Sequence, residues 1–349
     1  MHPRLFEIPF VHLTIWGFGV MMVAGFLSAL WLVRRASRRA GLDPEIMSDV
    51  ALYALILGVA GARTFFVLHH LDQFRGDFLG VFAIWRGGLE FLGGVGPAVA
   101  FLLFYLHRRK LPMRRYLDIL AMGLMIGLAF GRLGCFLNGC CFGRPTDLPW
   151  GLRFPYRSYA YVSQMNPDPQ RGRAEPYLDV PPYEYAAFYT ADGQWYPKPL
   201  EELTAQQQHE VTHGKYRCLP VHPTQLYASV HAFLLCGVLY LLWRRSIAGA
   251  GTGRNGWLAR PGVATAALCL LYGPGRFVLE AIRDDNPYEF ATLTISQIMG
   301  IVMFIGGLVL LAAHVADKLP VDRGGACAET PDVPIPEAVG DSQPEPDAG

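Results

Sequence analysis

The chain has 349 residues, of which 52% are hydrophobic and only 17% charged, whereas soluble domains carry roughly 25% charged residues. This composition excludes a pair of ordinary soluble domains and is typical of a protein that crosses a membrane several times. The net charge of +1, without a long basic run, does not indicate nucleic-acid binding, and the seven cysteines are too few and too scattered for a disulfide scaffold.

Seven apolar stretches are long enough to cross a bilayer core of ~30 Å, which takes about 20 helical residues. The first is too long for a cleavable signal peptide, and its arginine cluster follows the apolar run instead of preceding it. The sequence therefore predicts an all-α integral membrane protein with seven transmembrane helices. The predicted spans are residues 11–33, 50–70, 89–106, 117–137, 226–243, 262–282 and 293–315.

Positively charged residues gather in alternate short loops. Arginines follow the first span directly and recur between the third and fourth spans and between the fifth and sixth. The other short loops, residues 71–88 and 283–292, carry few of them. Because cytoplasmic loops carry the excess of Lys and Arg, we expect the N-terminus outside and the C-terminus inside.

This topology divides the chain into four parts. Residues 1–144 hold the first four helices, and residues 226–318 hold the last three. Between them, residues 145–225 are rich in Pro and Tyr and predict a small extracytoplasmic head domain, partly helical near residues 199–212. Residues 319–349 have few apolar side chains and predict a disordered cytoplasmic tail.

The segment 78–97 is unusual for a plain span. Two Gly-Gly pairs, beginning at Gly87 and Gly93, flank a stretch that carries Glu90. Irregular backbone is tolerated at membrane depth only where it lines a cavity, so we expect a re-entrant segment there. The alternative is a glycine-rich helix entry without a functional role.

Three arginines, Arg63, Arg132 and Arg276, lie at a similar depth in their spans, about 20–22 Å from the inner face at 1.5 Å per residue. Glu280 lies one turn beyond Arg276, and Arg283 one turn further on the same helix face. Charges in lipid should converge on a cavity, although Arg132 could instead snorkel from a helix end. Because guanidinium groups match phosphate oxygens in bidentate geometry, we expect a positive pocket for a lipid phosphate head group.

Histidines add to this outer face. His222 opens the segment His222-Pro-Thr-Gln-Leu-Tyr227 at the start of the fifth span. A histidine beside proline is often only a loop residue, but the place of this one makes it a candidate for the site. His69 and His70 end the second span, and since adjacent residues point different ways, at most one of them faces the pocket.

Four blocks of this sequence resemble the signatures of bacterial prolipoprotein diacylglyceryl transferases, and they occur in the family's order on the same seven-span topology. The resemblance covers residues 12–145 and 217–317. The blocks are Gly131-Arg-Leu-Gly-Cys-Phe-Leu-Asn-Gly with Gly143-Arg, Trp85-Arg-Gly-Gly-Leu with Gly93-Gly94, His222-Pro-Thr-Gln-Leu-Tyr227, and Tyr272-Gly with Arg276-Phe, Glu280 and Arg283.

The resemblance implies transfer of a diacylglyceryl group from phosphatidylglycerol to the lipobox cysteine thiol of a preprolipoprotein signal peptide. It implies a thioether product, release of glycerol phosphate, and a multi-pass protein of the bacterial inner membrane whose active site faces the outer leaflet. The partners would be phosphatidylglycerol, the preprolipoprotein and the lipid bilayer, and we expect no cofactor, no metal and no nucleic acid.

We predict four catalytic residues: Arg132, Arg276, Glu280 and His222. The two arginines would stabilise the departing phosphate, and the Glu280 carboxylate would either orient arginines or serve as base. Asn138 would donate to the phosphate as a neutral group. The predicted substrate-binding residues are Arg63, Gly87, Gly88, Gly93, Gly94, Asn138, Gly143, Gln225, Tyr227 and Arg283. The positive pocket would also lower the pKa of the acceptor thiol.

The chain departs from the family at four positions that commonly hold a His, a Tyr and two acids. Here these positions are Leu92, Phe18, Cys140 and Ala228. The groups that would hold phosphate are therefore kept, whereas several that could move protons are missing, and His222 or His70 are candidates to replace the family histidine. Three alternatives stay open: a homologue acting on another acceptor, a non-catalytic phospholipid-binding protein, and a channel or transporter, which the lack of an internal repeat disfavours.

Four cysteines fall at or beyond the outer face. We predict a disulfide that joins Cys140 or Cys141 to Cys218 at the base of the head domain, because that compartment is oxidising in many bacteria. The alternative is that they are small buried packing residues. A four-cysteine zinc site is disfavoured, since Cys135 falls within the end of a helix.

Overall fold

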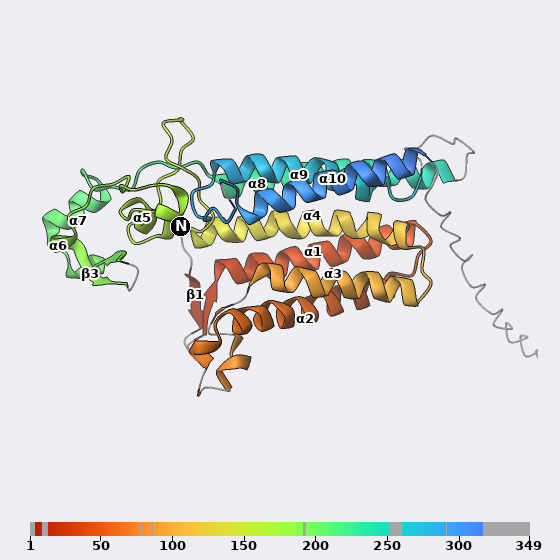
Figure 1. The fold of residues 1–349 in the computed structure, drawn as a ribbon, viewed down its shortest axis with the longest axis horizontal. Coiled ribbons are helices and arrows are strands. Elements are labelled where there is room, and N and C mark those ends of the chain that lie inside the picture. Colours follow the sequence, from red (N-terminus) through yellow and green to blue (C-terminus); the bar gives the residue numbers. More distant parts are fainter. Residues whose placement is uncertain are drawn as a thin grey trace, which may run out of the picture.

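The computed structural model describes residues 4–8, 13–74, 76, 79–84, 87–88, 90–190, 193–250, 260–290 and 292–316. Seven long helices in these residues run alongside one another, with α4 in the middle of the layer, α1, α2 and α3 on one side and α8, α9 and α10 on the other (Figure 1). Their bounds are α1 Gly17–Arg39, α2 Pro44–His69, α3 Phe91–Arg108, α4 Met113–Asn138, α8 Thr224–Ala250, α9 Val263–Ile282 and α10 Ile295–Val315.

Six of these helices are long and apolar enough to cross a membrane, and α3 is the exception. The prediction of an all-α membrane protein is confirmed, whereas the count of seven spans is not. The α3 helix has 18 residues and begins with a run of glycines. It nevertheless packs along α2, parallel to the rest of the layer (Figure 1).

Local chemistry sets the ends of the helices and corrects two predicted boundaries. The first helix begins at Gly17 and not at residue 11, because Leu13–Trp16 form strand β2, which pairs with β1, Arg4–Ile8. The second begins six residues earlier than predicted, because the Asp43 side chain accepts a hydrogen bond from the Glu45 amide and Pro44 takes the first helical position.

Glycines allow the helices to approach closely. A Cβ on Gly25 of α1 would lie 2.8 Å from the Cβ of Phe130 on α4, and one on Gly61 of α2 would lie 2.4 Å from the Gly93 carbonyl of α3. The second glycine pair of the segment 78–97 is therefore part of α3 and packs against α2. Before α3 the chain forms the short 3-10 helices η1, Leu71–Phe74, and η2, Leu79–Phe82.

The chain between α4 and α8 forms a small head, which lies beyond the end of α4 (Figure 1). It has its own hydrophobic cluster, which includes Phe154, Tyr161, Trp195 and Cys218. Its elements are α5 Tyr159–Gln164, η4 Pro169–Arg171, α6 Pro182–Tyr185, β3 Ala186–Tyr189, β4 Trp195–Pro197, η5 Leu200–Glu202 and α7 Ala205–Thr212. The helix expected near residues 199–212 is confirmed, whereas the tail expected at residues 319–349 lies outside the described residues.

Candidate active site

Glu280 is the centre of an ion cluster at the end of α9. Its carboxylate is 0% exposed and pairs with Arg276 at 2.8 Å and with Arg283 at 3.3 Å. The Asn286 amide also donates to it. Arg276, Glu280 and Arg283 are spaced four and three residues apart, which places them on one side of α9 and its end. A buried carboxylate held by two guanidinium groups and an amide is a fixed anion, well suited to orienting the arginines.

The guanidinium of Arg276 is held on two sides. Its Nη2 pairs with Glu280, and the same nitrogen donates to the Ser296 hydroxyl at 2.8 Å. Ser296 belongs to α10, so α9 and α10 together fix this group. Arg276 is therefore preorganised, and its Nε and Nη1 donate to no residue in the described part of the chain.

Arg132 of α4 lies close to Arg276, so that the two positive charges act on each other. Arg132 is half-buried, and it makes no hydrogen bond or ion pair with any residue that the structure describes. Arg132, Arg276 and Arg283 carry three positive charges against the two negative charges of Glu280 and Asp285, which leaves one positive charge in excess near Arg132 and Arg276. Such an arrangement attracts an anion that accepts from both arginines.

Arg283 directly follows the last residue of α9 and is held by two carboxylates, and its role in substrate binding stays a prediction. Its Nε and Nη2 donate to the two carboxylate oxygens of Asp285, both at 2.9 Å, while its Nη1 donates to Glu280. Burial lowers the pKa of Arg283, but its hydrogen bonds to Asp285 and the negative charge of that carboxylate raise the pKa overall. Three of its five N–H donors thus bind carboxylates inside the protein, where they stabilise the cluster.

An extended segment around Gly143 joins the start of α8 to the end of α9. The Gly143 amide donates to the His222 carbonyl at 3.0 Å, and the Arg144 amide donates to the Ile282 carbonyl at 2.9 Å. A Cβ on Gly143 would lie 2.6 Å from the His222 Cβ and 2.8 Å from its carbonyl oxygen. Gly143 is therefore a position of close backbone approach, and its contacts are with the chain itself.

Side chains from α8 hold the turn that follows α4. The Gln225 Nε2 donates to the Cys140 carbonyl at 2.7 Å, and the Thr224 hydroxyl donates to the Cys141 carbonyl at 2.6 Å. The Gln225 Oε1 is buried without a partner among the described residues. Asn138, the last residue of α4, donates to the Cys140 Sγ at 3.6 Å.

His222 and Tyr227 form a polar chain at the same end of the bundle. The His222 Nδ1 lies 3.4 Å from the Tyr227 hydroxyl, which accepts a hydrogen bond from Trp150 Nε1 at 2.7 Å. By contrast, the His70 Nδ1 contacts the carbonyl oxygen of Phe66, whose ring it stacks against. Through the Gly143 segment, His222 is tied to the end of α9, which carries the ion cluster.

Arg63 does not join the other two arginines, so the predicted convergence of all three on one cavity is wrong. It belongs to α2, on the far side of α1 from α4 (Figure 1). Its guanidinium donates four hydrogen bonds of 2.6–2.9 Å to backbone carbonyls. These carbonyls belong to Gly80, Val81, Gly87 and Gly88.

The first glycine pair, Gly87 and Gly88, has φ values of 85° and 77°, the left-handed region that favours glycine. This backbone turns two carbonyls toward Arg63, so the pair shapes a loop around a buried charge. The neighbouring Glu90 pairs with His69 at 2.8 Å. The expected re-entrant segment is thus, in its described residues, a loop closed on α2 and followed by α3.

The predicted disulfide is wrong. Cys135, Cys140, Cys141 and Cys218 are all free thiols, and Cys218 lies in the core of the head, with its Sγ 3.5 Å from Gln164 Oε1. Cys140 and Cys141 instead lie beside Cys135. Sequence separation alone could not reveal this, because the pairing depends on how the chain turns after α4.

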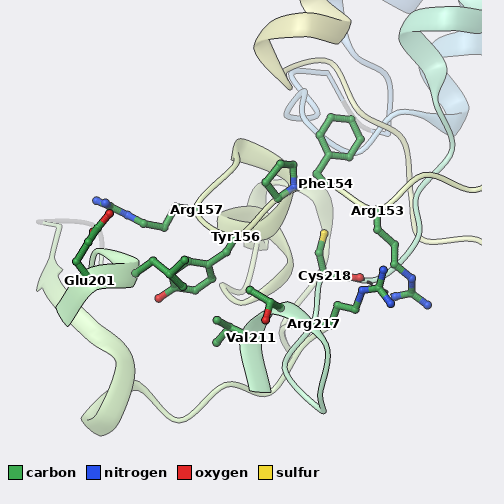
Figure 2. Close-up of a pocket in the computed structure, with 11 residues that line it drawn as sticks. Arg153, Phe154, Tyr156, Arg157, Glu201, Val211, Arg217 and Cys218 are labelled. Carbon is green, nitrogen blue, oxygen red and sulfur yellow. Dashed lines mark hydrogen bonds between the residues drawn. The ribbon is translucent and has the colours of Figure 1, made fainter. Parts of the chain in front are cut away.

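A cavity of about 460 Å³ opens in the head (Figure 2), and no residue of the ion cluster lines it. Three arginines, Arg153, Arg157 and Arg217, line it together with Tyr156 and Glu201. Arg153 is held by a 2.6 Å hydrogen bond to the Cys218 carbonyl. The sequence did not single out this cavity, and none of the predicted site residues lines it.

Comparison with known proteins identifies the family. The family described as "Prolipoprotein diacylglyceryl transferase" matches residues 3–313. A relative from Synechococcus elongatus, named phosphatidylglycerol–prolipoprotein diacylglyceryl transferase, is 27% identical over 98% of this chain and 94% of its own length. A relative of the same name from Erwinia tasmaniensis is 31% identical over 88% of this chain and 90% of its own length. The chain belongs to the prolipoprotein diacylglyceryl transferase family.

Proposed function

We propose that this protein transfers the diacylglyceryl group of phosphatidylglycerol to the thiol of a lipobox cysteine in a preprolipoprotein, the first step of lipoprotein maturation. The observation that carries the proposal is the pair Arg132 and Arg276. One guanidinium has no partner among the described residues, and the other is fixed beside it by Glu280 and Ser296. A phosphodiester is the anion that this pair fits, because its oxygens accept from both groups.

The reaction is a displacement at carbon. The sulfur of the acceptor thiolate attacks the glycerol carbon that bears the phosphate ester, the carbon–oxygen bond breaks, and glycerol phosphate leaves with the bonding electrons. The thiol proton passes to a base or to the departing phosphate. Negative charge grows on the phosphate as the bond breaks, and Arg132 and Arg276 stabilise it there.

Glu280 acts as the orienting carboxylate in this proposal. Its oxygens accept from Arg276, Arg283 and Asn286, so the carboxylate is engaged in positioning the two guanidinium groups. His222 is the better candidate for the base, because the Gly143 segment ties it to the end of α9 and a neutral imidazole nitrogen can accept a proton. Tyr227 would orient its ring.

The active site faces the outer leaflet of the bacterial inner membrane in this proposal. The positive-inside rule supports that orientation. Arg38 and Arg39 lie in the last turn of α1 and Arg108 in the last turn of α3, at the end of the bundle opposite the head (Figure 1). The ion cluster lies at the end of α9 that adjoins the head, which is the outer end by this rule.

The experiment supplies the purified protein with phosphatidylglycerol and a synthetic lipobox peptide. We expect the peptide to gain the mass of one diacylglyceryl unit, and a peptide with Ser in place of its cysteine to gain nothing. If phosphatidylglycerol binds while neither peptide is modified, the chain is a phospholipid-binding protein without this activity. Product formed only with another thiol acceptor would support the altered homologue instead.

A further inference from the structure

Three cysteines converge after the end of α4. The sulfur atoms of Cys135, Cys140 and Cys141 all lie within 4.8 Å of one another. Cys135 is in the last turn of the helix, and the other two follow the left-handed Gly139, whose φ is 79°. The Cys140 amide donates back to the Cys135 carbonyl at 3.2 Å, so the chain reverses over the helix end and brings the thiols together.

Tertiary contacts hold this arrangement in place. Cys141 has a φ of 61°, a conformation that residues with a side chain rarely adopt and that persists only when its surroundings stabilise it. Thr224 and Gln225 of α8 bind the carbonyls of both cysteines, at 2.6 and 2.7 Å, and Asn138 donates to the Cys140 sulfur. The three sulfurs are therefore placed by a defined hydrogen-bond network.

A cluster of three thiols fits a soft metal ion. Thiolate sulfur binds Zn²⁺ at about 2.3 Å, so three sulfurs around one ion lie roughly 4 Å apart, within the separation found here. Thiolates select Zn²⁺ and Cu⁺ over hard ions. The Arg283 guanidinium lies close enough for its charge to act on Cys141, and it would offset part of the negative charge of the ligands.

We propose that Cys135, Cys140 and Cys141 form a binding site for one thiophilic ion, Zn²⁺ or Cu⁺. Each thiol gives up its proton as its sulfur binds the ion, and no electron is transferred. A disulfide would use only two of the three sulfurs and would leave the third without a role. Cys218 takes no part, because it is buried in the head beside Gln164.

The site lies beside the candidate active site, since Arg283 pairs with Glu280 and is close enough to Cys141 for its charge to act there. A bound ion would place a new charge next to the arginines that hold the phosphate. Resting on the proposed function, we therefore expect the ion to slow diacylglyceryl transfer. The ratio of rates with and without the ion, taken within each variant, separates this effect from any change that a substitution makes by itself.

The binding experiment needs no activity. The full-length protein, purified in detergent without oxygen, is dialysed separately against Zn²⁺ and against Cu⁺, and the bound metal is measured by elemental analysis. We expect one ion per chain for at least one of the two metals. Each of the substitutions Cys135→Ser, Cys140→Ser and Cys141→Ser should weaken binding by about tenfold or more. Cys218→Ser, the matched control, should bind as the unaltered protein does.

A second measurement covers variants that fail to fold. In the unaltered protein, the ion should protect Cys135, Cys140 and Cys141 from a maleimide reagent together, as read by peptide mass spectrometry. The proposal is overturned if neither metal binds, if the three variants bind as the control does, or if two of these cysteines are joined by a disulfide in the anaerobic protein. Failure of diacylglyceryl transfer would leave these readouts intact and would count against the proposed function alone.

Discussion

The Glu280 carboxylate is completely buried, and it pairs at 2.8 Å with Arg276, one turn earlier in the same helix. A charge in such a place is stable only when paired, and here Arg283 supplies a second partner. The pair therefore couples the stability of the end of α9 to the position of the Arg276 guanidinium, which we propose binds the phosphate. The first two predictions separate these roles.

Arg132→Lys keeps the charge but loses the planar fork that binds two phosphate oxygens. We expect the transfer rate to fall about 30- to 1000-fold, equivalent to roughly 2–4 kcal/mol of transition-state stabilisation, while the protein stays folded. Arg276→Lys should behave alike. The control is Arg38→Lys at the opposite end of the bundle, which should leave the rate unchanged. Near-normal transfer by the Arg132→Lys, Arg276→Lys double variant would show that the two arginines do not bind the phosphate.

Glu280→Gln leaves two buried guanidinium groups without their shared carboxylate. We expect a loss of about 3–5 kcal/mol in unfolding free energy, together with weaker phosphatidylglycerol binding and slower transfer. Thermal unfolding in detergent, lipid binding and the transfer rate are the three measurements. Glu45→Gln breaks the exposed pair with Arg34 and should cost less than about 1 kcal/mol. Unchanged lipid binding with abolished transfer would instead identify Glu280 as the base.

Arg63→Lys tests whether this buried arginine supports a loop or a substrate. A lysine cannot reach the four carbonyls that Arg63 binds, so we expect the unfolding free energy to fall by about 2–3 kcal/mol. Limited proteolysis should then cleave faster between residues 71 and 90. Unaltered stability combined with weaker phosphatidylglycerol binding would show instead that Arg63 binds the substrate.

Gly143→Ala introduces a methyl group where the His222 backbone and Cβ already lie. We expect the extended segment to shift, at a cost of about 1–3 kcal/mol in stability, and the transfer rate to fall because His222 moves with it. Gly237→Ala is the control, since no atom of the described residues lies within 4 Å of a Cβ built at that position. Equal melting temperatures and rates for the two variants would contradict the close approach described here.

The orientation can be tested with introduced cysteines. Glu201→Cys places a thiol in the head, and Lys110→Cys places one between α3 and α4. A membrane-impermeant maleimide added to intact spheroplasts should modify the first and spare the second, as read by peptide mass spectrometry. The reverse pattern would invert the topology and place the proposed active site at the inner leaflet.

The sequence by itself determined the features that depend on neighbours along the chain. Apolar runs predicted the long helices, because a helix in lipid satisfies all its backbone groups internally. The spacing of Arg276, Glu280 and Arg283 predicted their common face, since residues three and four apart meet on a helix. The motifs that resemble those of the family also indicated that the site lies at the end of the bundle that carries Arg276, Glu280 and Arg283.

Only the tertiary structure decided which distant groups share a partner. Arg63 and Arg132 lie at similar predicted depths, yet one binds four loop carbonyls and the other lies beside Arg276. The cysteines after α4 meet Cys135 and not Cys218, because a left-handed turn reverses the chain there. Depth and spacing constrain a position along one helix, whereas these pairings depend on helix order and on backbone turns that long-range hydrogen bonds stabilise.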